Sequence, residues 1–225
     1  MKKLTLVATI IAFTFAANAN AATETATVNI TGTITPSSCT INSGANGGTI
    51  DFGKIRAASL YQGTTILHQK GALTVQCDTP TTALIRVSAN GDKNIIDAAV
   101  RGPTPISYKT DKEFANYTIA VENITAEGGT ASNSILITKD ANNDNINIRN
   151  IPADTFKTVG KARFPQDGNY FAAASTSDST NIGTFNNLTA NYDVAAVIDG
   201  GKARQALNDG EQTFTGVVTF ELEYI

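Results

Sequence analysis

The sequence predicts an all-β protein, most simply a single β-sandwich. Short segments alternate apolar and polar residues with a period of two, which is the pattern of strands with one buried face. Gly, Pro, Asn and Asp separate these segments at short intervals, as in sandwiches. Charged residues make up only 16% of the chain, and its abundant Thr favours strands over long helices. We find no internal repeat or linker, and 225 residues suit one such domain.

The first residues are expected to be a cleaved export signal. Lys2 and Lys3 precede an apolar run over residues 4–17, and the small-x-small pattern of a cleavage site ends at Ala21. The run is shorter than the roughly 20 residues of a membrane-spanning helix. We place the cleavage after Ala21, with Ala22 as the alternative. The three expected parts are a signal peptide (1–21), an N-terminal extension (22–31) and a body domain (32–225).

The extension and the start of the body form one alternating stretch. Ala26, Val28, Ile30 and Ile34 fall on one face, with Gly32 among them, and threonines and Asn29 fall on the other. This strand would begin almost at the mature N-terminus. Its apolar face therefore needs a partner, which is either its own domain or another molecule.

Further strands follow in order, and the whole chain offers about nine. We expect them at 49–55, 72–77, 83–87, 115–121, 134–138, 156–164, 169–174 and 192–198. Residues 57–62 could form one helical turn. Asp78-Thr79-Pro80 should end the strand before it, because proline cannot donate to a ladder, and Asp199-Gly200-Gly201 should form a turn.

The chain ends in a strand with large apolar residues on one face. Phe214, Val218, Phe220, Leu222 and Tyr224 share this face, with Gly216 between them, and Ile225 is the last residue. A strand with so many large side chains should pack centrally in a core. We expect Glu221 and Glu223, on its other face, to be solvated.

Cys39 and Cys77 are the two cysteines, and both lie in the exported part. An even pair in an oxidising compartment predicts a disulfide, which loop-closure entropy would make worth roughly 4 kcal/mol. The alternative is two free buried thiols.

The sequence offers little for catalysis or for a cofactor. His68, the only histidine, lies in a polar stretch, and we expect it at the surface. The motifs of triad hydrolases and of histidine-ligated zinc sites are missing. Residues 140–145 are only faintly similar to a calcium loop, since Asn145 and Ile151 replace its glycine and glutamate. We therefore predict no enzyme activity, no metal and no cofactor. Without Lys2 and Lys3, 15 basic residues remain against 20 acidic ones, a charge of −5, which disfavours nucleic acid or an anionic membrane as a partner.

Taken together, these residues resemble the pilins of the bacterial chaperone–usher family. The resemblance rests on the cleavable signal, the short alternating extension, and Gly32-Thr33-Ile34 followed by Cys39. It continues through Ile50-Asp51-Phe52-Gly53, Cys77 at the end of a strand, and a penultimate Tyr224 in an alternating final strand. It covers both ends and the first third of the chain, whereas residues 90–205 share only general β character.

The resemblance implies an immunoglobulin-like sandwich that lacks its last strand. A periplasmic chaperone would fill the groove beside the final strand and hold the carboxylate of Ile225. At an outer-membrane usher, the extension of another subunit would then replace the chaperone, which is donor-strand exchange. By position, Ala26, Val28 and Ile30 would be the inserted residues, with Glu24 at the outer end. Ala26 stands where the family favours Gly. The family's glycine near the final strand matches neither Gly210 nor Gly216 cleanly, which leaves the groove boundary open.

The expected function is thus a structural subunit of a fimbria at the cell surface. Its partners would be the chaperone, the usher, and other copies or sister subunits, and a host glycan or surface receptor is a further candidate. One alternative is a secreted carbohydrate-binding sandwich or tip adhesin, whose N-terminal strand would pair within its own chain. Another is an exported β-rich hydrolase that uses carboxylates.

Overall fold

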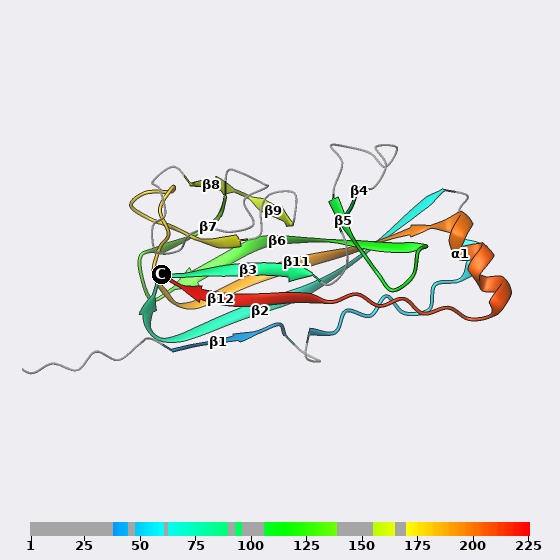
Figure 1. Ribbon diagram of the computed structural model, residues 1–225. Helices are drawn as coiled ribbons and strands as arrows, with labels where there is room; N and C mark the ends of the chain where they lie inside the picture. Colours follow the sequence, from blue (N-terminus) through cyan, green and yellow to red (C-terminus); the bar gives the residue numbers. More distant parts are fainter. Residues whose placement is uncertain are drawn as a thin grey trace, which may run out of the picture. The chain divides into compact units, whose positions relative to one another are not determined.

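Two antiparallel β-sheets face each other in the part of the chain that the structure describes (Figure 1). The structure is a computed structural model, and it describes residues 38–44, 48–60, 63–89, 93–95, 106–138, 155–164 and 170–225. All of them belong to the compact unit Pro36–Ile225. The prediction of an all-β sandwich is confirmed.

The larger sheet has seven strands, with β2, β11 and β6 at its middle. Its order is β1 (Cys39–Asn42), β2 (Thr64–Thr81), β11 (Phe185–Asp199), β6 (Ala115–Glu127), β5 (Ile106–Lys109) and β4 (Lys93–Ile95), and β9 (Lys161–Phe164) also pairs with β6.

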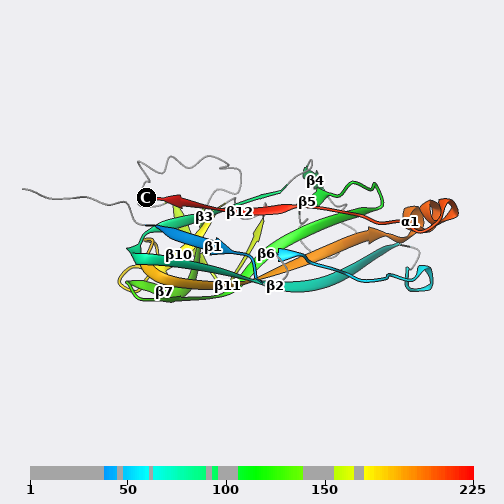
Figure 2. The same cartoon turned by 90° about the horizontal axis from the view of Figure 1, so that it is seen from below.

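The smaller sheet has five strands, and its edge is formed by the last strand of the chain. Its order is β12 (Val218–Tyr224), β3 (Ala83–Ala89), β10 (Tyr170–Ser175), β7 (Ala131–Thr138) and β8 (Phe156–Val159). The views in Figures 1 and 2 agree that the carboxyl terminus and the short helix α1 (Gly200–Ala206) lie at opposite ends of the sandwich.

The main core lies between the two sheets. From the larger sheet, every second residue of β11 contributes to it, namely Leu188, Ala190, Tyr192 and Val194. From the smaller sheet, it receives Ile85, Val87, Ile135, Ile137 and Phe171. A separate cluster around α1 contains Leu60, Phe114, Ala115, Ile198 and Ala203. This second cluster closes the α1 end of the sandwich, because burial of such side chains is favourable.

Several element boundaries differ from the sequence prediction. Residues 49–55 form no strand. β2 starts earlier than expected and runs through Pro80. The register of its pairing with β11 shifts between the pairs Thr81↔Phe185 and Gln76↔Asn187. The ladder between β2 and β1 ends at Cys77. Pro80 therefore falls in an irregular stretch, where the missing N–H costs no ladder hydrogen bond.

Two more boundaries have a local physical cause. The expected strand 156–164 is divided at Gly160 into β8 and β9, which belong to different sheets. The expected turn after β11 is instead the start of α1, because the Asp199 carboxylate accepts hydrogen bonds from the N–H groups of Gly201 (2.9 Å) and Lys202 (3.1 Å). The expected helical turn is confirmed as a 3₁₀ turn at Ala57–Ser59, and a second one follows α1 at Leu207–Asp209.

The final strand is shorter than predicted and is not enclosed by neighbours. β12 begins at Val218, so Phe214 and Gly216 precede it. Val218, Phe220 and Leu222 are only partly buried, although they pack against the main core. Their exposure has a simple reason, since β12 is an edge strand and a groove lies beside it.

Candidate functional site

The two sheets each end in an unpaired edge on the same side of the sandwich. Among the described strands, β12 pairs only with β3, and β1 pairs only with β2. An edge strand presents N–H and C=O groups that can bind a further strand. β1 and β12 approach each other at one end, where the Tyr224 hydroxyl accepts a hydrogen bond from the Cys39 N–H (3.1 Å).

An elongated groove of about 970 Å³ opens where these edges diverge. One wall is the segment after β1, from Gly48 to Arg56, and the other is the segment before β12, from Glu211 to Val218. The floor is formed by core side chains of the larger sheet, namely Tyr117, Ile119, Tyr192, Val194 and Ile198. A mostly apolar groove that runs up to the free edge strand β12 suits an extended peptide segment with alternating apolar side chains.

Tyrosine hydroxyls tie both walls to the floor. Tyr192 of β11 donates to the carbonyl of Ser43, 2.9 Å away, on the β1 side. Tyr117 of β6 donates to the carbonyl of Val217, 2.8 Å away, on the β12 side. Burial raises the pKa of both hydroxyls, so both remain protonated donors at neutral pH.

Two glycines allow these tyrosine rings to lie flat against backbone. A Cβ at Gly216 would come within 2.5 Å of the Tyr117 ring, and a Cβ at Gly71 would come within 2.1 Å of the Tyr192 ring. Any larger residue would therefore displace the ring, and with it the hydroxyl that holds the wall. Of the two glycines considered for the boundary, Gly216 lines the groove, whereas Gly210 follows the 3₁₀ turn with a φ of 104°.

Aromatic side chains meet across the groove toward the α1 end. The ring centroids of Phe52 and Phe214 lie 6.2 Å apart, one from each wall. Phe214 also meets Phe114 edge-on at 6.4 Å. Nearby, Lys54 and Glu211 form an exposed ion pair at 3.9 Å, which contributes little on its own. Here side chains of the two walls contact each other.

The predicted disulfide is confirmed. Cys39 of β1 and Cys77 of β2 are bonded and lie directly opposite in the ladder. The bridge fixes β1, which is the edge strand next to the groove, to the body of the larger sheet.

The structure separates the predicted groove residues into two sets. Phe214, Val218 and Phe220 line the groove. Leu222 packs against the core, while Tyr224 and Ile225 are 43% and 51% exposed at the end where β1 and β12 meet. Glu24, Ala26, Val28 and Ile30 lie outside the described residues, as does the expected cleavage site.

The sequence prediction missed the tyrosines of the floor as site residues. Tyr117 and Tyr192 were expected only as members of alternating strands. The available signal was a tyrosine at an inward-facing position, since a buried hydroxyl needs a hydrogen-bond partner. Gly216 and Gly71 carried no comparable signal, because the rings that cover them come from distant strands.

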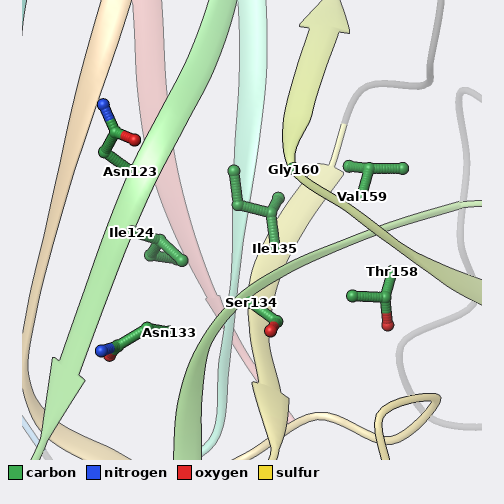
Figure 3. Close-up of a pocket in the computed structure, with 8 residues that line it drawn as sticks. All are labelled: Asn123, Ile124, Asn133, Ser134, Ile135, Thr158, Val159 and Gly160. Carbon is green, nitrogen blue, oxygen red and sulfur yellow. The ribbon is translucent and has the colours of Figure 1, made fainter.

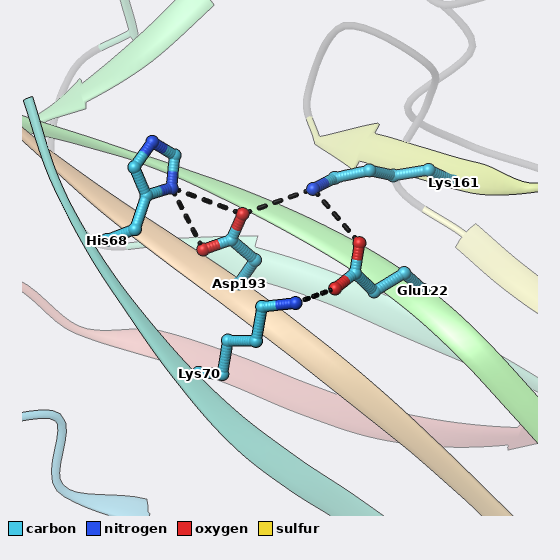
Figure 4. A network of polar contacts seen from close by, with 5 residues as sticks. All are labelled: His68, Lys70, Glu122, Lys161 and Asp193. Atoms are coloured by element: carbon cyan, nitrogen blue, oxygen red, sulfur yellow. Dashed lines mark hydrogen bonds and ion pairs between the residues drawn. The ribbon is translucent and has the colours of Figure 1, made fainter.

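Figure 4 shows a network of charged groups on the larger sheet. Asp193 and Glu122 alternate with core residues such as Tyr192 and Val121, so the network lies on the outer face, opposite the groove floor. His68 Nδ1 and Lys161 Nζ each lie 3.1 Å from a carboxylate oxygen of Asp193, and Lys161 also reaches Glu122 at 3.1 Å. Lys70 completes the chain of contacts by donating to Glu122. The side chain of His68 is 59% exposed, as predicted for a surface residue.

The network lowers the pKa of both carboxyl groups. Burial alone would raise the pKa of Asp193, but hydrogen bonds from His68 and Lys161 outweigh it. The pKa of Glu122 is lowered by hydrogen bonds from Lys70 and Lys161, and the same contact raises the pKa of Lys70. Each acid in the network therefore has a lysine ammonium beside it.

A smaller cavity of about 320 Å³ lies between β6, β7 and β8 (Figure 3). Asn123, Asn133, Ser134 and Thr158 supply its polar lining. Asn123 has a φ of 52° and sits in a bulge of β6, where two residues face one of β11. Asparagine tolerates this conformation, so the bulge explains the backbone.

The described residues were also compared with the requirements of metal sites and membrane helices. Within them, no group of three or more His, Cys, Asp or Glu side chains is arranged to hold a metal ion. In the same ranges, no helix has the length and apolarity needed to cross a membrane.

Comparison with known proteins found that part of the chain is similar to a described family. Residues 28–139 match the family described as "Protein of unknown function (DUF1120)". This match includes both cysteines, the groove wall at 48–56 and the strand that carries Tyr117. A search of curated proteins found no match.

Proposed function

We propose that this protein is a structural subunit of a bacterial surface fimbria that polymerises by donor-strand exchange. The single observation that carries the proposal is the apolar groove between the segment that follows β1 and the segment that leads into the unpaired edge strand β12. A β-sandwich that exposes its core along such a groove gains stability from any strand that fills it.

The occupant is argued from the same chain. Residues 22–31 alternate apolar and polar side chains, with Ala26, Val28 and Ile30 on one face. When such a segment binds in the groove of another copy, its backbone pairs with an edge strand and its apolar face covers the floor. The groove and the segment are different parts of the same chain, so the contact between copies is head-to-tail and produces a chain of subunits.

Assembly by this route requires partners that protect the groove. A periplasmic chaperone would supply a temporary strand and an outer-membrane usher would exchange it for the segment of the next subunit, as the resemblance to pilins implies. The protein would then pass through the periplasm to the cell surface and contribute to adhesion.

Deletion of residues 22–31 tests the proposal. The variant keeps its groove, so it should still be bound by a chaperone or capped by a synthetic peptide of residues 22–31. It should not insert into another subunit, and polymers made by this variant alone should disappear from electron micrographs. Normal polymers from the deletion variant would refute the proposal.

A further inference from the structure

The backbone direction of β12 defines which groups its free edge offers. Ile225 N–H donates to the carbonyl of Thr82, and Tyr224 lies opposite Ala83. In an antiparallel ladder, hydrogen-bonded and non-hydrogen-bonded pairs alternate. The odd-numbered residues of β12 therefore bond to β3, and Val218, Phe220, Leu222 and Tyr224 direct their N–H and C=O groups to the free side.

The same alternation continues before β12, where β3 is no longer the partner. Thr215 donates its N–H to the Asp111 carboxylate (2.6 Å) and accepts a hydrogen bond from the Asp111 N–H (3.1 Å). The carbonyl of Val217 accepts from Tyr117. Asp111 and Tyr117, both from the larger sheet's side, thus bind the odd-numbered residues in place of β3.

Burial supports an extended backbone in this segment. Gln212 and Phe214 are partly buried, whereas Glu211, Thr213 and Thr215 are exposed, which is the period-two pattern of a strand. With the odd-numbered groups bound, the N–H and C=O groups of Phe214 and Gly216 lie on the free side. Among the described residues, no hydrogen bond is found to these four groups.

The groove follows this segment more closely than it follows β12. Its lining includes Thr213 to Val218 and Phe220 but not Leu222 or Tyr224. At the other end of β12, the contact between Tyr224 and Cys39 brings β1 against β12. The groove lining therefore extends along Thr213 to Val218 and Phe220, where Phe52 meets Phe214 from the opposite wall, and it does not reach Tyr224.

We infer that the edge that binds a further strand runs from Phe214 to Phe220, and so lies nearer to α1 than β12 does. Asp111 and Tyr117 fix the backbone of its first half by their hydrogen bonds to Thr215 and Val217. The occupant is residues 22–31 of a second copy, and in this respect the inference rests on the proposed function. β12 has seven residues, Val218–Tyr224. The inferred edge contains only the first three of them, together with the four residues that precede β12. Asp111 and Tyr117 are thus positioning residues for the bound strand.

Amide hydrogen exchange, measured by NMR on the full chain, tests this edge. The chain would carry Val28→Asp and Ile30→Asp so that its own segment does not fill grooves, and the probe is a synthetic peptide of residues 22–31. We expect the peptide to slow exchange at Phe214, Gly216, Val218 and Phe220 by about tenfold or more, and to leave Tyr224 within about twofold.

A matched pair of variants tests the role of Asp111. Asp111→Ala should abolish the slowing at Phe214 and Gly216 and retain it at Val218 and Phe220. Asp178→Ala is the control, because among the described residues its carboxylate bonds to Thr180 and Asn181 of its own loop, and it should behave like the parent. A peptide that binds but protects Val218 to Tyr224 instead would overturn the inference and leave the proposed function standing. Failure of the peptide to bind at all would overturn both.

Discussion

The hydroxyl of Tyr224 lies 3.1 Å from the backbone nitrogen of Cys39 and 3.5 Å from its carbonyl oxygen. One side chain of the last strand therefore holds both polar backbone groups of the first residue of β1. Because Cys39 is also bonded to Cys77, this contact joins the edge of the smaller sheet to a fixed point of the larger sheet. It marks the end of the sandwich at which the groove is closed.

Removal of this hydroxyl should loosen the closed end. Tyr224→Phe keeps the ring and loses the hydrogen bonds to Cys39, so we expect the free energy of unfolding to fall by about 0.5–1.5 kcal/mol. Urea denaturation measures the change. Ile225→Ala is the control, since its side chain is half exposed, and it should stay within about 0.5 kcal/mol of the parent. Equal stability of Tyr224→Phe and the parent would show that the contact contributes nothing.

A methyl group at Gly216 should disturb the wall of the groove. Its Cβ would lie 2.5 Å from the Tyr117 ring, so Gly216→Ala must move the ring or the backbone of residues 215–217. We expect a loss of about 1–3 kcal/mol, again from denaturant unfolding. Gly160→Ala is the matched control, because a Cβ there meets no atom within 4 Å. If both variants unfold alike, the packing of Tyr117 on Gly216 is not a constraint.

The strand pattern of the fold could be predicted from the sequence, and the edges of the strands could not. Alternation at Leu73, Val75 and Cys77, or at Tyr117, Ile119 and Val121, follows from burial of one face and is visible in the chain. The continuation of β2 through Pro80 depends on a slip in its pairing with β11, which lies more than a hundred residues away. The residues around Pro80 therefore do not indicate that the strand continues through them.

The sequence predicted that a groove lies beside the final strand, but not which residues form its walls and floor. The alternating final strand pointed to residues from Phe214 to Tyr224, and the structure places Phe214, Val218 and Phe220 in the groove. The opposite wall contains residues 49–55, which were expected to be a strand because Ile50 and Phe52 alternate, and they form none. The floor depends on Tyr117 and Tyr192, whose role follows from hydrogen bonds to Val217 and Ser43 that only the tertiary structure shows.

The charged network should make stability fall at acid pH. The pKa values of Glu122 and Asp193 are lowered in the folded protein, so their contribution is complete above their ordinary pKa values. It is lost as the pH falls through the lowered values, because protons then bind the unfolded chain first. We therefore expect the free energy of unfolding to decrease steeply below about pH 4.

Glu122→Gln should make that decrease shallower, since the variant lacks one of the two carboxyl groups. Unfolding by urea at several pH values between neutral and acid would measure the slope. Glu211→Gln is the control, because Glu211 is exposed and pairs only loosely with Lys54 at 3.9 Å. The explanation fails if Glu122→Gln has the same pH dependence as the parent.

The most direct test of strand exchange places charges on one face of residues 22–31 at a time. Val28→Asp with Ile30→Asp puts two carboxylates on the apolar face, whereas Thr27→Asp with Asn29→Asp puts the same charges on the polar face. The measurement is the length distribution of polymers, by electron microscopy and by gel electrophoresis without boiling. We expect the first variant to form no polymers and the second to polymerise like the parent. Equal polymerisation by both variants would contradict insertion of this segment into the groove beside β12.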